Sequence, residues 1–226
     1  MISITLPCNR PEALHRTLAN IQDTMRGWVE VIVCSPFPFG NMVLHNGMVI
    51  HVFDEHEAGC NAGHMMAASY ATGDYITAWV DDHLYVDGWD ELIIKNFERF
   101  GTTCQPLCLG LKHANRRQFG TVFGKYYPYF PFMRRSDLGR VGGWISGDYK
   151  SGFADCDLAM RVWAAGGYCT SSVDDLVLVH EDDNRKGQSV NCHPQDMELF
   201  VQRWKPRFGR GWDTSHLRGF NVDVRQ

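Results

Sequence analysis

Short apolar runs alternate with helical patterns over the first hundred residues. Apolar positions 14, 18, 21 and 25 share one face of a helix that Pro11 is suited to begin. Two further helices are predicted over 59–72 and 89–100. The apolar runs predict strands at 2–6, 28–34, 48–53 and 75–80. This alternation favours an α/β fold with a mostly parallel, Rossmann-like central sheet flanked by helices.

The second half of the chain is less regular. Residues 121–133 hold six aromatic side chains and two prolines, which predicts a mixture of strand and loop. The glycine-rich run 139–147 predicts a flexible connection, 155–165 a helix, and 176–179 a short strand. Apolar positions 197, 200, 201 and 204 predict a late helix, which a basic, glycine-rich tail follows.

Length and composition are those of an ordinary globular protein. The chain has 226 residues, of which 44% are hydrophobic and 21% charged, with a net charge of −4. It has no internal repeat and no long linker, so we expect one domain over 1–226. Its parts are two halves, at about 1–100 and 101–190, and a C-terminal helix and tail at 191–226. The net charge argues against a general nucleic-acid-binding protein.

Cysteine usage and the start of the chain bear on location. Eight cysteines are scattered without a Cys-x-x-Cys pair, which favours buried free thiols over zinc sites or a disulfide framework. The first residues do not form a signal peptide, and no apolar run approaches the ~20 residues that span a bilayer. We therefore expect a cytoplasmic protein without a transmembrane anchor.

Adjacent carboxylates, Asp81 and Asp82, directly follow the fourth predicted strand. Ligands of open α/β sheets bind at the carboxyl ends of the strands. Two like charges at such a place require compensation, for example by a divalent cation that carries a diphosphate. Oxygen ligands suit Mg²⁺ or Mn²⁺, and a nearby imidazole favours Mn²⁺. The competing interpretation is a solvated turn.

Asp155 and Asp157 lie at the opening of the helix predicted over 155–165. Favourable interaction with the helix dipole explains one of them, and the other is a candidate general base. Arg161 lies one helical turn beyond Asp157 and can pair with it. His180, at the end of the last predicted strand, is either a metal ligand or a structural histidine.

Two further motifs are ambiguous. Gly59 and Gly63 either allow close approach of phosphate to the backbone or serve helix packing. The tail around WKPRFGRGW is either a basic tail or a segment that binds nucleic acid, anionic sugar or diphosphate.

Four of these segments, in this order, resemble the inverting family 2 glycosyltransferases of the GT-A fold. They are ITLPCNRPEALHRTL, the stretch from EAGCNAG through ATGDYITAWVDDHLYVDGW, the block from Arg134-Arg135 to Gly166-Gly167-Tyr168, and the closing Val179-His180. The resemblance covers about residues 2 to 183.

The resemblance implies roles for individual residues. Pro7, Asn9 and Arg10 would line the pocket for the nucleotide base, and Gly59 and Gly63 would neighbour base and ribose. His64 stands where many members carry a diphosphate-side arginine. Asp81 would face ribose, Asp82 and His180 would hold the metal, and Asp155 would be the catalytic base. The chain departs from the family at Val80, where a carboxylate is usual, at Cys34-Ser35, where an Asp usually binds the base, and at Ala154.

The resulting hypothesis is a metal-dependent inverting transferase that uses a nucleotide-diphospho-sugar. The resemblance implies a UDP- or GDP-like donor, and we expect a UDP-sugar. The acceptor would dock over the second half, where Trp144 and Asp157 are candidate contacts; an aromatic core is the other interpretation of this region. The acceptor is open among a glycan, a lipid-linked sugar, a protein and a modified nucleic acid. The rival functions are a nucleotidyltransferase, although LPCNRPEAL lacks a glycine-rich phosphate loop, and a non-catalytic sugar-binding module.

Overall fold

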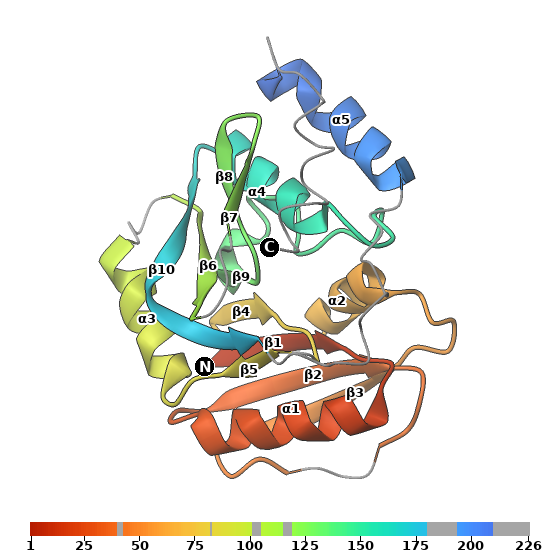
Figure 1. Ribbon diagram of the computed structural model, residues 1–226, viewed down its shortest axis with the longest axis vertical. Helices are drawn as coiled ribbons and strands as arrows, with labels where there is room; N and C mark the ends of the chain where they lie inside the picture. The colour runs from red at the N-terminus through yellow and green to blue at the C-terminus, as the bar shows by residue number, and fades with distance from the viewer. Residues whose placement is uncertain (40–42, 82, 101–104, 115–118, 180–193, 210–226) are drawn as a thin grey trace.

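The computed structural model describes residues 1–39, 43–81, 83–100, 105–114, 119–179 and 194–209 (Figure 1). Its helices are α1 (Pro11–Thr24), α2 (Cys60–Ala68), α3 (Trp89–Phe100), the 3₁₀ helix η1 (Arg135–Asp137), α4 (Ala154–Ala164) and α5 (Pro194–Phe208). Its strands are β1 (Ile2–Pro7), β2 (Val29–Ser35), β3 (Gly47–Phe53), β4 (Tyr75–Ala78), β5 (His83–Tyr85), β6 (Leu107–His113), β7 (Phe119–Val122), β8 (Lys125–Pro128), β9 (Pro131–Arg134) and β10 (Tyr168–Val179).

One mixed sheet, in the order β3-β2-β1-β4-β9-β6-β10-β5, organises the molecule. β3, β2, β1 and β4 are parallel neighbours, and β6 is parallel to β10. β9 lies between β4 and β6 and runs antiparallel to both, and β5 is antiparallel to β10. β7 and β8 form a second, two-stranded antiparallel sheet, and β8 packs against β6, β10 and α4. The predicted α/β architecture with a mostly parallel central sheet is confirmed.

The two faces of the sheet bury separate hydrophobic cores, because successive side chains of a strand point to opposite faces. Ile2, Ile4 and Leu6 of β1 pack with the apolar faces of α1 and α3. The other face packs against α2, α4 and α5, with Ile32 and Ile76 among its buried residues. Helices thus cover both faces and leave the carboxyl ends of β1 and β4 at one edge (Figure 1).

A buried carboxylate fixes the opposite edge of the sheet. Glu30 of β2 has no exposed surface and accepts hydrogen bonds from the Ser3 hydroxyl, from the Thr72 N–H and hydroxyl, and from the Gly73 N–H. Burial alone would raise the pKa of Glu30, but these donors outweigh it and lower that pKa. The turn before β4 is thereby tied to β1 and β2.

The structure differs from the sequence predictions mainly in the second half. β7, β8 and β9 replace the undivided aromatic segment, and β10 is much longer than the predicted strand at 176–179. The segment 139–147 is built of turns, and its Val141, Trp144 and Ile145 side chains are buried, so it contributes to the core. Among the described residues, no helix is long and apolar enough to cross a membrane.

Candidate active site

The Asp81 carboxylate lies beyond the carboxyl end of β4 and is held by the loop between β1 and α1. Arg10 donates to both carboxylate oxygens, from Nε to Oδ2 at 2.9 Å and from Nη2 to Oδ1 at 2.5 Å. The Cys8 thiol donates to Oδ2 at 3.0 Å. Burial, together with this neighbouring charge, raises the pKa of Cys8 to about 12, so the thiol stays protonated. The predicted donor-site residues Arg10 and Asp81 therefore form one ion pair.

The backbone around Asp81 is fixed from α1. The hydroxyl of Thr17 donates to the Asp81 carbonyl oxygen at 3.2 Å, and Arg16 Nη2 reaches the same oxygen at 3.4 Å. The sequence explains this arrangement, because Pro11 begins α1 as predicted and leaves Arg10 at the N-cap, beside the end of β4. Asn9, in the same loop, is exposed.

Glycines bring α2 against the ends of β1 and β2. A Cβ on Gly63 would lie 2.9 Å from Pro7 Cβ and 3.5 Å from Cys34 Sγ, so only glycine allows this approach. Gly59 caps α2 with a φ of +93°, a conformation that favours glycine. Helix packing therefore accounts for Gly63, and the amino end of α2 lies beside half-buried Pro7.

His64 is buried beneath this region. Its Nδ1 lies 2.8 Å from the Thr5 hydroxyl, which also accepts a hydrogen bond from Trp144 Nε1 at 3.3 Å. Burial lowers the pKa of His64 to about 3, so the imidazole is neutral at physiological pH. A neutral ring cannot supply the positive charge of the arginine that it replaces in the resemblance. Trp144, a candidate acceptor contact, is buried and packs in the core.

Asp155 lies in the first turn of α4, where it is half-buried. Burial raises its pKa to about 6, although its Oδ1 accepts a hydrogen bond from the Cys156 N–H at 2.8 Å. A carboxylate with such a pKa can both accept and release a proton near neutral pH. The residue that precedes the helix, Phe153, has a φ of +63°, which costs about 1–2 kcal/mol in a residue other than glycine.

Asp157 has the opposite environment. Its side chain has no exposed surface, and its oxygens accept hydrogen bonds from four side chains. The donors are Tyr149 Oη at 3.0 Å, Arg161 Nε at 2.8 Å, Arg203 Nη1 at 3.2 Å and Trp204 Nε1 at 2.8 Å. The predicted pairing of Arg161 with Asp157 is present. In this conformation Asp157 offers no surface to an acceptor, so its position supports a structural role.

The two predicted metal ligands, Asp82 and His180, lie outside the described residues. Their described neighbours in the sequence, His83 and Val179, are register partners of β5 and β10. Among the described residues, no group of three His, Cys, Asp or Glu side chains could hold a metal ion. The metal assignment therefore remains a prediction.

Sequence analysis missed the residues that hold the others in place. Thr5, Cys8, Tyr149 and Asp196 each make hydrogen bonds to residues remote in the sequence. Cys8 alone had a local signal, because it lies between Pro7 and Asn9 in the motif of the first loop.

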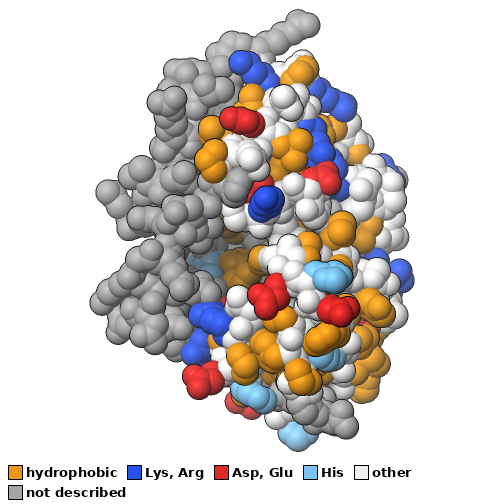
Figure 2. All heavy atoms as spheres, turned by 90° about the vertical axis from the view of Figure 1, so that its right-hand side faces the viewer, with side chains coloured by type: hydrophobic (Ala, Val, Ile, Leu, Met, Phe, Trp, Pro, Cys, Tyr) orange, Lys and Arg blue, Asp and Glu red, His pale blue; other side chains and the backbone are white. Residues whose placement is uncertain are grey.

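The surface over α5, α2 and β3 carries charges of both signs interspersed (Figure 2).

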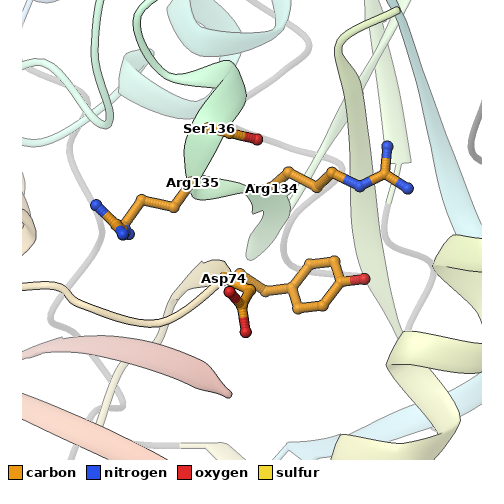
Figure 3. Close-up of a pocket in the computed structure, with 5 residues that line it drawn as sticks. Asp74, Arg134, Arg135 and Ser136 are labelled. Carbon is orange, nitrogen blue, oxygen red and sulfur yellow. The ribbon is translucent and has the colours of Figure 1, made fainter. Parts of the chain in front are cut away.

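A separate pocket of about 230 Å³ lies at the amino end of β4, away from Asp81. Asp74, Tyr75, Arg134, Arg135 and Ser136 line it (Figure 3). The arginines extend in different directions, and Arg135 Nε donates to the Gly73 carbonyl oxygen at 2.6 Å. Arg134 lies over the ring of Phe97 at 5.0 Å. These side chains reinforce the edge of the sheet rather than the candidate site.

No protein-family model and no curated protein sequence matches this chain. Solved structures of S. aureus TarS do match it. TarS 1–349 in complex with UDP-GlcNAc superposes with a TM-score of 0.64 at 12% identity, over 88% of this chain and 65% of that chain. The complex of TarS 1–349 with UDP gives 0.61 at 12% identity, over 99% and 75%.

A further TarS structure gives a TM-score of 0.61 at 13% identity, over 88% of this chain and 39% of that chain. This chain therefore spans about two fifths of the protein in that structure. TarS is a family 2 glycosyltransferase of the GT-A class. The chain accordingly has a GT-A glycosyltransferase-like fold.

Proposed function

We propose that this chain is an inverting glycosyltransferase that moves a sugar from a UDP-sugar to an acceptor hydroxyl. The observation that carries the proposal is the placement of Asp155. The segment that leads into it packs on the amino end of α2, where Asn61 Nδ2 donates to the Tyr149 carbonyl oxygen at 3.0 Å. This contact supports a place for Asp155 near the side of the sheet where ligands of such folds bind. UDP and UDP-GlcNAc are bound to TarS, which shares this fold.

The donor would lie over the carboxyl ends of β1 and β4. Pro7, Asn9 and Arg10 would contact its base, and Gly59 and Gly63 would neighbour base and ribose. The Arg10–Asp81 ion pair would fix the Asp81 carboxylate beside the ribose. His64 is neutral and buried, and its contact with Thr5 supports the carboxyl end of β1 from below. Other groups would therefore have to neutralise the charge of the diphosphate.

A divalent cation, Mn²⁺ or Mg²⁺, is part of the proposal. Both Asp81 oxygens are taken by Arg10 and Cys8, so Asp81 does not suit a ligand role in this arrangement. Asp82 and His180 would hold the cation, because a carboxylate oxygen and an imidazole fit Mn²⁺ and the carboxylate also fits Mg²⁺. Bound there, the cation would neutralise charge on the departing diphosphate.

Asp155 would act as the general base. Its carboxylate takes the proton of the acceptor hydroxyl while the hydroxyl oxygen bonds to the anomeric carbon. The bond from that carbon to the diphosphate oxygen breaks on the opposite face, so UDP leaves with the electron pair and the configuration inverts. A pKa near 6 keeps the base ionised at neutral pH.

The acceptor class stays open among a glycan, a lipid-linked sugar, a protein and a modified nucleic acid. Cys8, Cys34, Cys108 and Cys169 are buried free thiols, which supports a reducing, cytoplasmic location.

A binding screen and a turnover assay test the proposal. Thermal shift is measured with UDP-, GDP-, CMP- and dTDP-sugars, each with and without Mn²⁺. A ligand at 100 times its Kd adds about 2.7 kcal/mol, or roughly 5–11 °C for a chain of this size. We expect stabilisation by a UDP-sugar that EDTA abolishes. Release of UDP by the wild type, but not by Asp155→Asn, separates an enzyme from a sugar-binding module. Binding that persists unchanged with EDTA contradicts the metal assignment.

A further inference from the structure

We propose that α5 is a positioning element for Asp155, and that Asp196 is the residue through which it acts. The inference rests on the proposed function, in which Asp155 is the base. α5 lies beside α4 at one end of the molecule (Figure 1), and its Phe200 and Trp204 belong to the buried cluster that contains α4. No residue of α5 has a role in the proposed chemistry, yet its polar side chains reach the segment that precedes the base.

Asp196 binds the backbone of three consecutive residues. Its carboxylate accepts hydrogen bonds from the N–H groups of Lys150 at 2.9 Å, Ser151 at 2.8 Å and Gly152 at 3.0 Å. The side chain is 2% exposed. Burial would raise the pKa of Asp196, but the backbone donors outweigh it and lower that pKa. Asp196 is thus an ionised carboxylate built into the loop, and Gly152 lies three residues before Asp155.

The next residue of this segment is held by stacking. Phe153 adopts the left-handed backbone conformation that turns the chain into α4, with a φ of +63°. Its ring stacks on Phe200 of α5 at 5.2 Å, and Phe200 is fully buried. An unfavourable backbone conformation persists only where its surroundings enforce it. Here α5 supplies part of that enforcement, immediately before the first turn of the helix that carries the base.

The amino end of α2, beside the proposed donor site, contacts the same segment on the side opposite α5. Asn61 of α2 binds the Tyr149 carbonyl oxygen, and a Cβ on Gly59 would lie 3.6 Å from the Lys150 carbonyl oxygen. The segment 149–152 is therefore enclosed between the amino end of α2 and α5. Loss of the contacts with α5 would let this segment, and with it Asp155, move relative to the donor. A shift of about 1 Å in a reacting group can cost 10²-fold in rate.

Asp196→Ala is the test, with Glu198→Ala as the matched control. Glu198 is an exposed acidic residue of the same helix. Wild-type binding and turnover of UDP-sugars are measured first. We expect Asp196→Ala to lower kcat about tenfold or more while the donor KM changes less than about threefold. The acidic limb of the kcat profile should move to lower pH, because a loosened Asp155 becomes more hydrated. Asp196→Asn, which keeps one acceptor oxygen, should give an intermediate kcat.

Hydrogen–deuterium exchange gives a readout that needs no substrate. Peptides over 148–158 should exchange faster in Asp196→Ala and unchanged in Glu198→Ala. If Asp196 only docks α5, the melting temperature falls while kcat, its pH limb and exchange over 148–158 match the wild type, and the inference is overturned. If Asp196→Ala does not fold, the same comparison is made with Asp196→Asn. A wild type without turnover refutes the proposed function. In that case hydrogen–deuterium exchange over 148–158 alone tests whether Asp196 positions this segment.

Discussion

Replacing Asp155 by Asn should stabilise the folded protein at neutral pH while it abolishes the proposed base. Burial raises the pKa of Asp155 from 3.8 to about 6, so the folded state holds its proton more tightly than the unfolded chain does. Ionised Asp155 therefore opposes folding. Each pKa unit corresponds to about 1.36 kcal/mol, which sets an upper bound near 3 kcal/mol. Because the side chain is only half-buried, we expect a gain of about 1–3 kcal/mol.

The pH dependence identifies the cause. Well below the unfolded-state pKa of 3.8 the carboxyl is protonated in both states, and the wild type carries no penalty. The penalty grows between about pH 4 and 6, as the unfolded chain loses its proton first, and is complete above the folded-state pKa. Asn does not titrate, and it can still accept the hydrogen bond from the Cys156 N–H. The difference in stability between variant and wild type should therefore be small at pH 4 and largest above pH 6.

Urea denaturation at pH 4.0, 5.0, 6.0 and 7.5 measures this difference, with the exposed Glu198→Gln as a control whose difference stays small throughout. A gain of 1–3 kcal/mol corresponds to roughly 2–12 °C in melting temperature for a chain of this length. A variant less stable than the wild type at pH 7.5, or a difference equal at pH 4 and 7.5, would falsify the assignment of a raised pKa to Asp155.

Three other substitutions test the packing and polar contacts. Asp157→Asn should lower the free energy of unfolding by about 3–5 kcal/mol, because it leaves buried donors without a charge partner; a loss below about 1 kcal/mol in urea would contradict its structural role. Gly63→Ala should cost about 1–3 kcal/mol, because the new methyl group lies 2.9 Å from Pro7 Cβ; Gly139→Ala, with open space around it, is the control. Glu30→Gln should cost about 1–3 kcal/mol at pH 7. Because the pKa of Glu30 is lowered, that cost should shrink as acid titration protonates the wild-type carboxylate, and equal costs at pH 7 and pH 3 would count against it.

The sequence predicted the elements in which the apolar residues recur with the period of a strand or a helix. β1, β2 and α1 were identified because each buries one face or both faces through a local pattern. β9 was not, because its residues lie within an aromatic segment with two prolines and no period. β10 was found only at its end, because its middle is polar and its register with β6 shifts between Ser171 and Asp175.

For the residues of the candidate site, local interactions were likewise predictable and interactions between distant parts of the sequence were not. The pairing of Arg161 with Asp157 follows from helical spacing and was predictable. The neutrality of His64 was not, because it depends on burial against Thr5, 59 residues away in sequence. Asp196 gave no signal, since its partners lie about 45 residues earlier in the chain.

The insertion of β9 between β4 and β6 has a consequence for biosynthesis. The ribosome delivers β3, β2, β1 and β4 first, and these can pair as soon as they emerge. The outer edge of β4 then has no strand partner until residues 131–134 follow, more than fifty residues later. During that interval a row of backbone N–H and carbonyl groups is available to strands of other chains. Slow elongation between residues 79 and 130 would lengthen this exposure, and it should therefore lower the yield of native protein until the four-residue strand β9 arrives.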